Sequence, residues 1–144
     1  MNKKNLYLGG VLVALAVAFL VYCGNGSSTE PSAPPTVKDD PSFAADIQSI
    51  FNTSCISSGC HNAAGSAGLV LLSGQSYGNI VNVDSTQDNT KKRVLPNDAV
   101  NSYLVIKIEG RQTTGGRMPL GGSALNSNAI QNIKNWINKG AKNN

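Results

Sequence analysis

Histidine is almost absent from this chain, since His61 is the only imidazole among 144 residues. The other soft donors are also few, and they are Cys23, Cys55, Cys60, Met1 and Met118. A four-ligand zinc site therefore lacks donors unless an aspartate or Cys23 joins His61 and the paired cysteines. Charged residues make up only 14% of the chain, and no long basic stripe with interleaved aromatic residues accompanies the net charge of +4. This composition argues against nucleic acid as a partner.

The amino terminus has the pattern of an export signal. A short basic head with Lys3 and Lys4 precedes an almost unbroken apolar run over residues 6–22, which is slightly short of the roughly 20 apolar residues in a membrane-spanning helix. Cys23 closes the run and resembles the lipidated cysteine of bacterial lipoproteins, with Tyr22 where a small residue is usual. We expect residues 1–23 to be a signal peptide ending at a lipidated Cys23, or an uncleaved membrane anchor. Either would hold an exported protein at the periplasmic or cell-surface face of a bacterial membrane.

Residues 24–40 differ in composition from the rest of the chain. They are rich in glycine, serine, threonine and proline, and Val37 is their only aliphatic residue beyond alanine. Such a segment buries too little apolar surface to offset the entropy of ordering. We therefore predict a flexible linker over residues 24–40 and one folded domain over residues 41–144.

Apolar periodicity and end signals predict several helices in this domain. A first helix should begin at Ser42 as N-cap, with one apolar face formed by Phe43, Ile47, Ile50 and Phe51. A short helix is expected within residues 73–81. Another should begin at Asn97 or Asp98, carry Val100 and end at Gly110. The last helix should span residues 127–138, with an apolar stripe that consists of Ile130, Ile133, Trp136 and Ile137.

The two paired cysteines and the single histidine lie in one short stretch, Cys55-Ile56-Ser57-Ser58-Gly59-Cys60-His61. A Cys-x-x-Cys-His run is typical of c-type haem attachment, in which two thiols add to the porphyrin vinyl groups and the histidine ligates iron. Here four residues separate the cysteines instead of two. Ser58 and Gly59 can bulge outward while Cys60 and His61 keep their local geometry, so that the first thiol still reaches its vinyl group.

Other interpretations of the cysteine pair remain open from the residues alone. A Cys55–Cys60 disulfide suits an exported chain, but it leaves His61 and Met118 without a role. A catalytic cysteine activated by His61 needs a free thiolate and a separately placed base, whereas neighbouring residues rarely face each other.

Met118 is the only thioether left once Met1 is removed with the leader. It lies in the glycine-rich loop of residues 113–122, directly before Pro119, which restrains its backbone to an extended conformation. Core methionines belong on helices and strands, so this position indicates a ligand. With one histidine, a haem with two histidine ligands is impossible within one polypeptide. A His61/Met118 pair would raise the potential of the iron and leave no open position for oxygen or peroxide. This favours an electron carrier over an enzyme.

These residues, in this order, resemble class I c-type cytochrome domains, over about residues 41–141. The features shared are the thiols with His61, residues 95–98 followed by residues 102–104, the Arg117-Met118-Pro119 segment, and the terminal helix that leads to Ala141. The resemblance implies a small all-α domain with one haem c per chain. In it Cys55 and Cys60 form the thioether bonds, His61 is the proximal ligand and Met118 the distal ligand.

The same resemblance implies a single-electron carrier whose partners are redox proteins. The alternative is a haem peroxidase or a small-ligand sensor, if Met118 leaves the iron. Arg111 or Arg117 is expected either to pair with a haem propionate or to be exposed to solvent. The basic cluster of residues 91–93 is expected to be either a docking patch for an acidic redox partner or a solvated loop.

Overall fold

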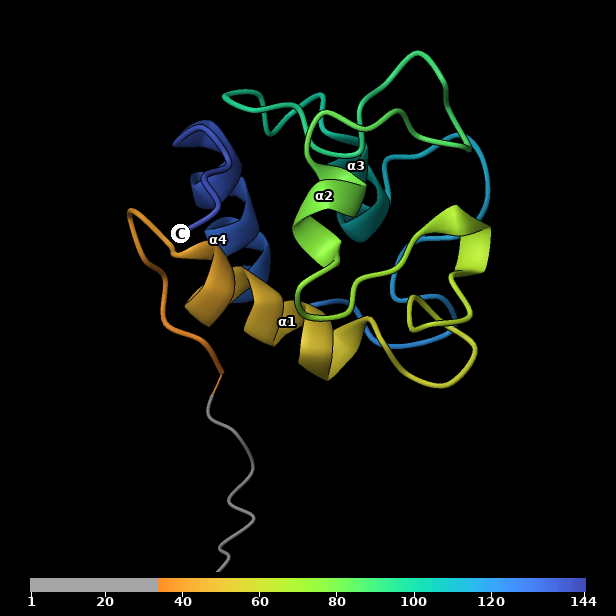
Figure 1. Ribbon diagram of the computed structural model, residues 1–144, viewed down its shortest axis with the longest axis horizontal. Coiled ribbons are helices and arrows are strands. Elements are labelled where there is room, and N and C mark those ends of the chain that lie inside the picture. The colour runs from red at the N-terminus through yellow and green to blue at the C-terminus, as the bar shows by residue number, and fades with distance from the viewer. Residues whose placement is uncertain (1–33) are drawn as a thin grey trace, which may run out of the picture. The chain divides into compact units, whose positions relative to one another are not determined.

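The computed structural model describes residues 34–144. The predicted signal or anchor, Cys23 and the first part of the predicted linker lie outside the described residues. The helices are α1 (Gln48–Ser54), α2 (Ser76–Ile80), α3 (Tyr103–Glu109) and α4 (Ser127–Asn138), with a π-helical turn η1 (Phe43–Ile47) and a 3-10 turn η2 (Ser66–Gly68) (Figure 1). No strand occurs in this part of the chain, which confirms the helical class. Nor is any helix between residues 34 and 144 long and apolar enough to span a membrane.

The first helical segment begins where the sequence predicted. The Ser42 hydroxyl accepts a hydrogen bond from the Ala45 N–H at 3.4 Å, so Ser42 is the N-cap of η1. The helix continues directly from η1 into α1, and its predicted apolar face is buried: Phe43, Ile47, Ile50 and Phe51. Because α1 ends at Ser54, this buried face fixes the position from which the cysteine loop departs.

An aromatic cluster joins the two ends of the domain. The Phe43 ring lies 5.2 Å from Trp136 of α4 and 5.1 Å from Tyr77 of α2, measured between ring centroids. Trp136 is 1% exposed, and its indole N–H donates to the Lys142 carbonyl at 2.8 Å. The predicted bounds of α4 and its buried stripe are confirmed, although Ile130 is only partly buried.

The helix expected from Asn97 or Asp98 begins later, at Tyr103, so this start was wrong. Asn97 has a φ of 67°, and the Asp98 carboxylate accepts from the Asn101 N–H at 3.0 Å. The side chain thus closes a local turn that competes with the helix. As a result Val100 is 64% exposed instead of lying on a helix face. The predicted end is correct, since Gly110 caps α3 with a φ of 77°.

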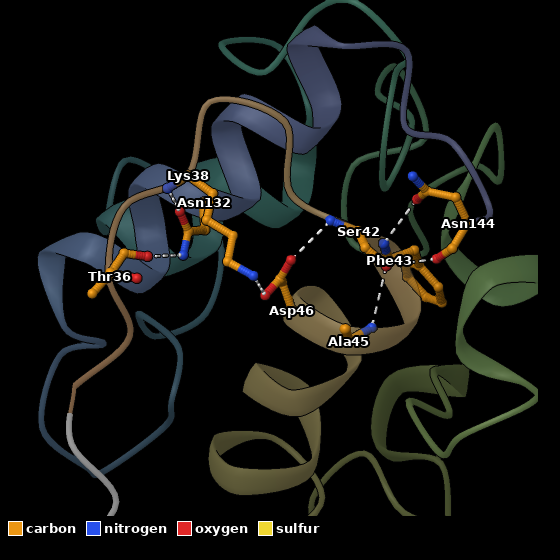
Figure 2. Close-up of polar contacts among 8 residues, drawn as sticks. All are labelled: Thr36, Lys38, Ser42, Phe43, Ala45, Asp46, Asn132 and Asn144. Atoms are coloured by element: carbon orange, nitrogen blue, oxygen red, sulfur yellow. Dashed lines mark hydrogen bonds and ion pairs between the residues drawn. The ribbon is translucent and has the colours of Figure 1, made fainter.

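The last residues of the predicted linker are attached to α4 (Figure 2). The Asn132 side chain accepts from the Lys38 N–H and donates to the Thr36 carbonyl, both at 2.8 Å. The Lys38 ammonium also pairs with Asp46 of η1 at 2.6 Å. Residues 36–38 therefore form a strap on the domain, whose structured part starts before the predicted residue 41.

Replacing Asn132 with alanine should lower the free energy of unfolding by about 1–3 kcal/mol, because two hydrogen bonds are lost from a side chain that is 2% exposed. Urea denaturation followed by circular dichroism measures this. Asn128→Ala is the matched control, since Asn128 lies on the same helix and its side chain forms no hydrogen bond to other residues in the range 34–144, and it should change stability by less than about 0.5 kcal/mol. Equal effects of the two substitutions would show that the strap is not bound in solution.

Candidate functional site

The cysteine loop folds back on the end of α1. The Cys55 N–H donates to the Phe51 carbonyl at 2.9 Å, and the Cys55 carbonyl accepts from the His61 N–H at 3.0 Å. Between them the Cys60 N–H donates to the Ser57 carbonyl at 2.9 Å, and Gly59 takes a φ of 78°. Of the four residues between the cysteines, Ile56 packs against the core and residues 57–59 form an exposed turn, with Cys55 and His61 adjacent at its base.

The orientation of the His61 ring is fixed by a backbone carbonyl. The Nδ1 atom lies 3.2 Å from the Leu69 oxygen, and the His61 carbonyl accepts from the Leu71 N–H at 2.7 Å. A hydrogen bond to Leu69 requires the proton on Nδ1, which leaves the lone pair of Nε2 free. Metal-ligating histidines use the same arrangement, in which the second nitrogen donates to a carbonyl and fixes the tautomer.

Met118 is positioned by the end of α3. Its N–H donates to the Lys107 carbonyl at 2.9 Å. The helix stops at Gly110, where a Cβ would lie 3.2 Å from the Arg117 Cδ, so the arginine stem lies across this glycine. The chain therefore turns back at Gly110 and returns Met118 to the last turn of α3.

These segments enclose one cavity with two adjoining hollows. Their volumes are about 90 and 240 Å³, and both hollows are lined by Cys55, His61, Ala67, Gln87, Ile108 and Met118. The smaller hollow continues to Leu71 and Ile80, whereas Cys60 lines only the larger one. In Figure 1 the loop after α1 and the loop after α3 lie on the same side of the domain. The fold thus brings all four predicted site residues to one cavity.

The two thiols are in different environments. Cys60 is exposed, whereas Cys55 is half-buried, and burial followed by the nearby Cys60 raises the pKa of Cys55 to about 11. Cys55 is therefore a protonated thiol near neutral pH, which makes it a poor nucleophile for the cysteine–histidine alternative. Both thiols are free, so the structure contains no disulfide between Cys55 and Cys60. Within residues 34–144 no three or more histidine, cysteine, aspartate or glutamate side chains gather as a metal site.

Arg111 and Arg117, of which one was expected either to pair with a haem propionate or to be exposed to solvent, do not line the cavity. Arg111 pairs with Glu109 at 2.7 Å, and Arg117 donates to the Gly122 carbonyl at 3.1 Å. Of the basic cluster, Lys92 pairs with Asp84 at 2.6 Å on the surface. Arg93 is half-buried and lines the smaller hollow, so it is not part of a solvated loop.

Two cavity residues were missed by the sequence analysis, Lys107 and Gln87. Lys107 is 6% exposed, and burial lowers its pKa. A signal for it existed, because Lys107 stands between Ile106 and Ile108 on a helix whose other residues are largely apolar. Gln87 carries no such signal, since it lies in a polar loop.

Comparisons with known protein families, with curated proteins and with solved structures found no match for this chain.

Proposed function

We propose that this protein is a single-electron carrier that holds one covalently attached haem c, with His61 and Met118 as the axial ligands of the iron. The observation that carries the proposal is the meeting of Cys55, His61 and Met118 at one largely apolar cavity, with Cys60 at its larger hollow. Two thiols, an imidazole and a thioether are the donors that c-type haem uses. The residues present therefore fit the group.

Each part of the chain has a definite task in this proposal. The Leu69 carbonyl holds Nδ1 of His61, which lines the cavity, so that Nε2 is the nitrogen left for iron, and the Lys107 carbonyl holds the backbone of Met118. Leu71, Ile80 and Ile108 form apolar walls that exclude water. When bound, the haem supplies a one-electron couple between ferric and ferrous iron. With His61 and Met118 both holding the iron, no position would be open to oxygen or peroxide, and the site would favour electron transfer over ligand chemistry.

The proposed location follows from the leader. We propose an exported protein, held at a bacterial membrane by a lipid on Cys23 or by an uncleaved anchor, that exchanges electrons with redox proteins. This location is supported by the basic head, the apolar run and Cys23 in residues 1–23.

Mass spectrometry of the full chain, exported by a host that matures c-type cytochromes, tests the proposal. We expect the added mass of one haem, together with a lipid and cleavage before Cys23. In Cys55→Ala the haem should remain attached through Cys60 alone, with a shifted pyridine haemochrome spectrum. A colourless product without added mass would contradict the proposal, and an unchanged spectrum in Cys55→Ala would mean that Cys55 forms no bond to the haem.

A further inference from the structure

Two cations line the smaller hollow and have no carboxylate partner among the residues that the structure describes. Lys107 and Arg93 both line it. The ion pairs among residues 34–144 use other cations: Lys38, Lys92, Arg111 and Lys134. Because burying a charge is unfavourable unless it is paired, two unpaired cations on one cavity wall need an explanation.

Lys107 has little compensation for its burial. Its ammonium is 3.5 Å from the Thr114 carbonyl, and this long contact is its one side-chain hydrogen bond within the described part of the chain. A Cβ on Gly115 would lie 3.3 Å from the same nitrogen, so the ammonium lies close against the backbone of the loop before Met118. An ammonium has three donors, and at least two of them remain available.

Arg93 is held in place but not neutralised. Its guanidinium donates to the Asn79 carbonyl at 2.8 Å and to the Gly68 carbonyl at 3.1 Å, both uncharged groups. Five N–H donors are available on this side chain, so others remain free. Tyr103 and Gln87, which hydrogen-bond to each other at 3.4 Å, line the same hollow and add neutral polar groups.

The cations and the exposed thiol lie at different parts of the cavity. Arg93 and Lys107 line the smaller hollow only, whereas Cys60 lines the larger hollow only. The haem ring is arranged in the same way, because its vinyl groups, which react with thiols, and its two carboxylates are on opposite edges of the ring. We infer that Lys107 and Arg93 bind the two haem carboxylates, with the haem oriented so that these point into the smaller hollow. This inference rests on the proposed function.

The experiment uses the full chain carrying Cys55→Ala and Cys60→Ala, so that binding is reversible, and titrates it with iron protoporphyrin or with its dimethyl ester by absorbance. The dicarboxylate should bind on the order of tenfold more tightly than the ester, as expected when hydrogen bonds to charged groups are lost. Adding Lys107→Met, which keeps the length of the side chain, should bring the affinities for the dicarboxylate and the ester close to each other. Arg93→Gln should also reduce the ratio of the two affinities, and Lys139→Met, at an exposed position, should leave it unchanged.

The outcomes separate the two proposals. Equal binding of the two porphyrins, or an unchanged ratio in both Lys107→Met and Arg93→Gln, would overturn the orientation while leaving haem binding intact. Binding of neither porphyrin would overturn this inference, whereas the proposed function is overturned only if the unmutated exported chain carries no haem mass. Circular dichroism of each variant shows that it is folded, and Lys107→Met is expected to fold because it removes an unpaired buried charge.

Discussion

Replacing Met118 with alanine in the haem-loaded protein should abolish the weak far-red absorption band of thioether-ligated ferric iron. No other thioether is expected to replace it, because Met1 is the only other methionine and belongs to the predicted leader. The midpoint potential should fall, since the soft donor that favours the ferrous state is lost and axial ligands tune haem potentials over a range of about 0.8 V. Carbon monoxide should then bind the ferrous protein, as the sixth position is open.

Thr113→Ala is the matched control for this substitution. Thr113 is exposed in the same loop and does not line the cavity, so the band, the potential and the resistance to carbon monoxide should all be retained. If the unmutated protein already lacks the far-red band and binds carbon monoxide readily, Met118 is not a ligand, and the peroxidase or sensor alternative is favoured over the carrier.

The second large effect concerns stability and does not depend on haem. Trp136→Ala should lower the free energy of unfolding by about 3–5 kcal/mol, the usual loss for a buried tryptophan. Trp136 is 1% exposed, packs against Phe43 and donates to the Lys142 carbonyl. Because whole domains are stable by only about 5–15 kcal/mol, this variant should be close to unfolding at room temperature.

Denaturation should be followed by far-ultraviolet circular dichroism, since Trp136 is the only tryptophan and its fluorescence is lost with it. Val100→Ala truncates an apolar side chain that is 64% exposed and should change stability by less than about 0.5 kcal/mol. Trp136→Phe should fall between the two, because it keeps part of the ring contact and loses the indole hydrogen bond. A loss in Trp136→Ala no greater than in Val100→Ala would mean that the aromatic cluster does not hold the domain together.

Local patterns predicted the segments whose stability comes from one apolar face and a clear cap. The helix that begins after Ser42 and the helix Ser127–Asn138 are of this kind, because periodicity and end signals agree there. The start of α3 was predicted too early, because Asp98 caps a turn as readily as it caps a helix. Local sequence could not decide between these, whereas the fold shows that Ser102 accepts from the Leu95 N–H and fixes the turn before α3.

Charged residues were the least predictable part of the site. Arg93 stands in a basic cluster, which is the sequence context of a surface residue. Whether its side chain lies in solvent or at the cavity depends on how the chain folds back on itself. The strap of residues 36–38 was not predicted for the same reason, since its partner Asn132 lies far away in the sequence. Such long-range contacts leave no local periodicity in the sequence.

The sequence by itself determined which donors exist: one imidazole, one thioether outside the predicted leader and two thiols in one short loop, because side-chain chemistry is set by residue type alone. Only the tertiary structure decided that these donors meet at one cavity and that Lys107 and Arg93 line a part of it that Cys60 does not. The physical reason is that the end of α3 and the loop after α1 pack against the same hydrophobic cluster, a long-range contact that the residue pattern does not encode locally.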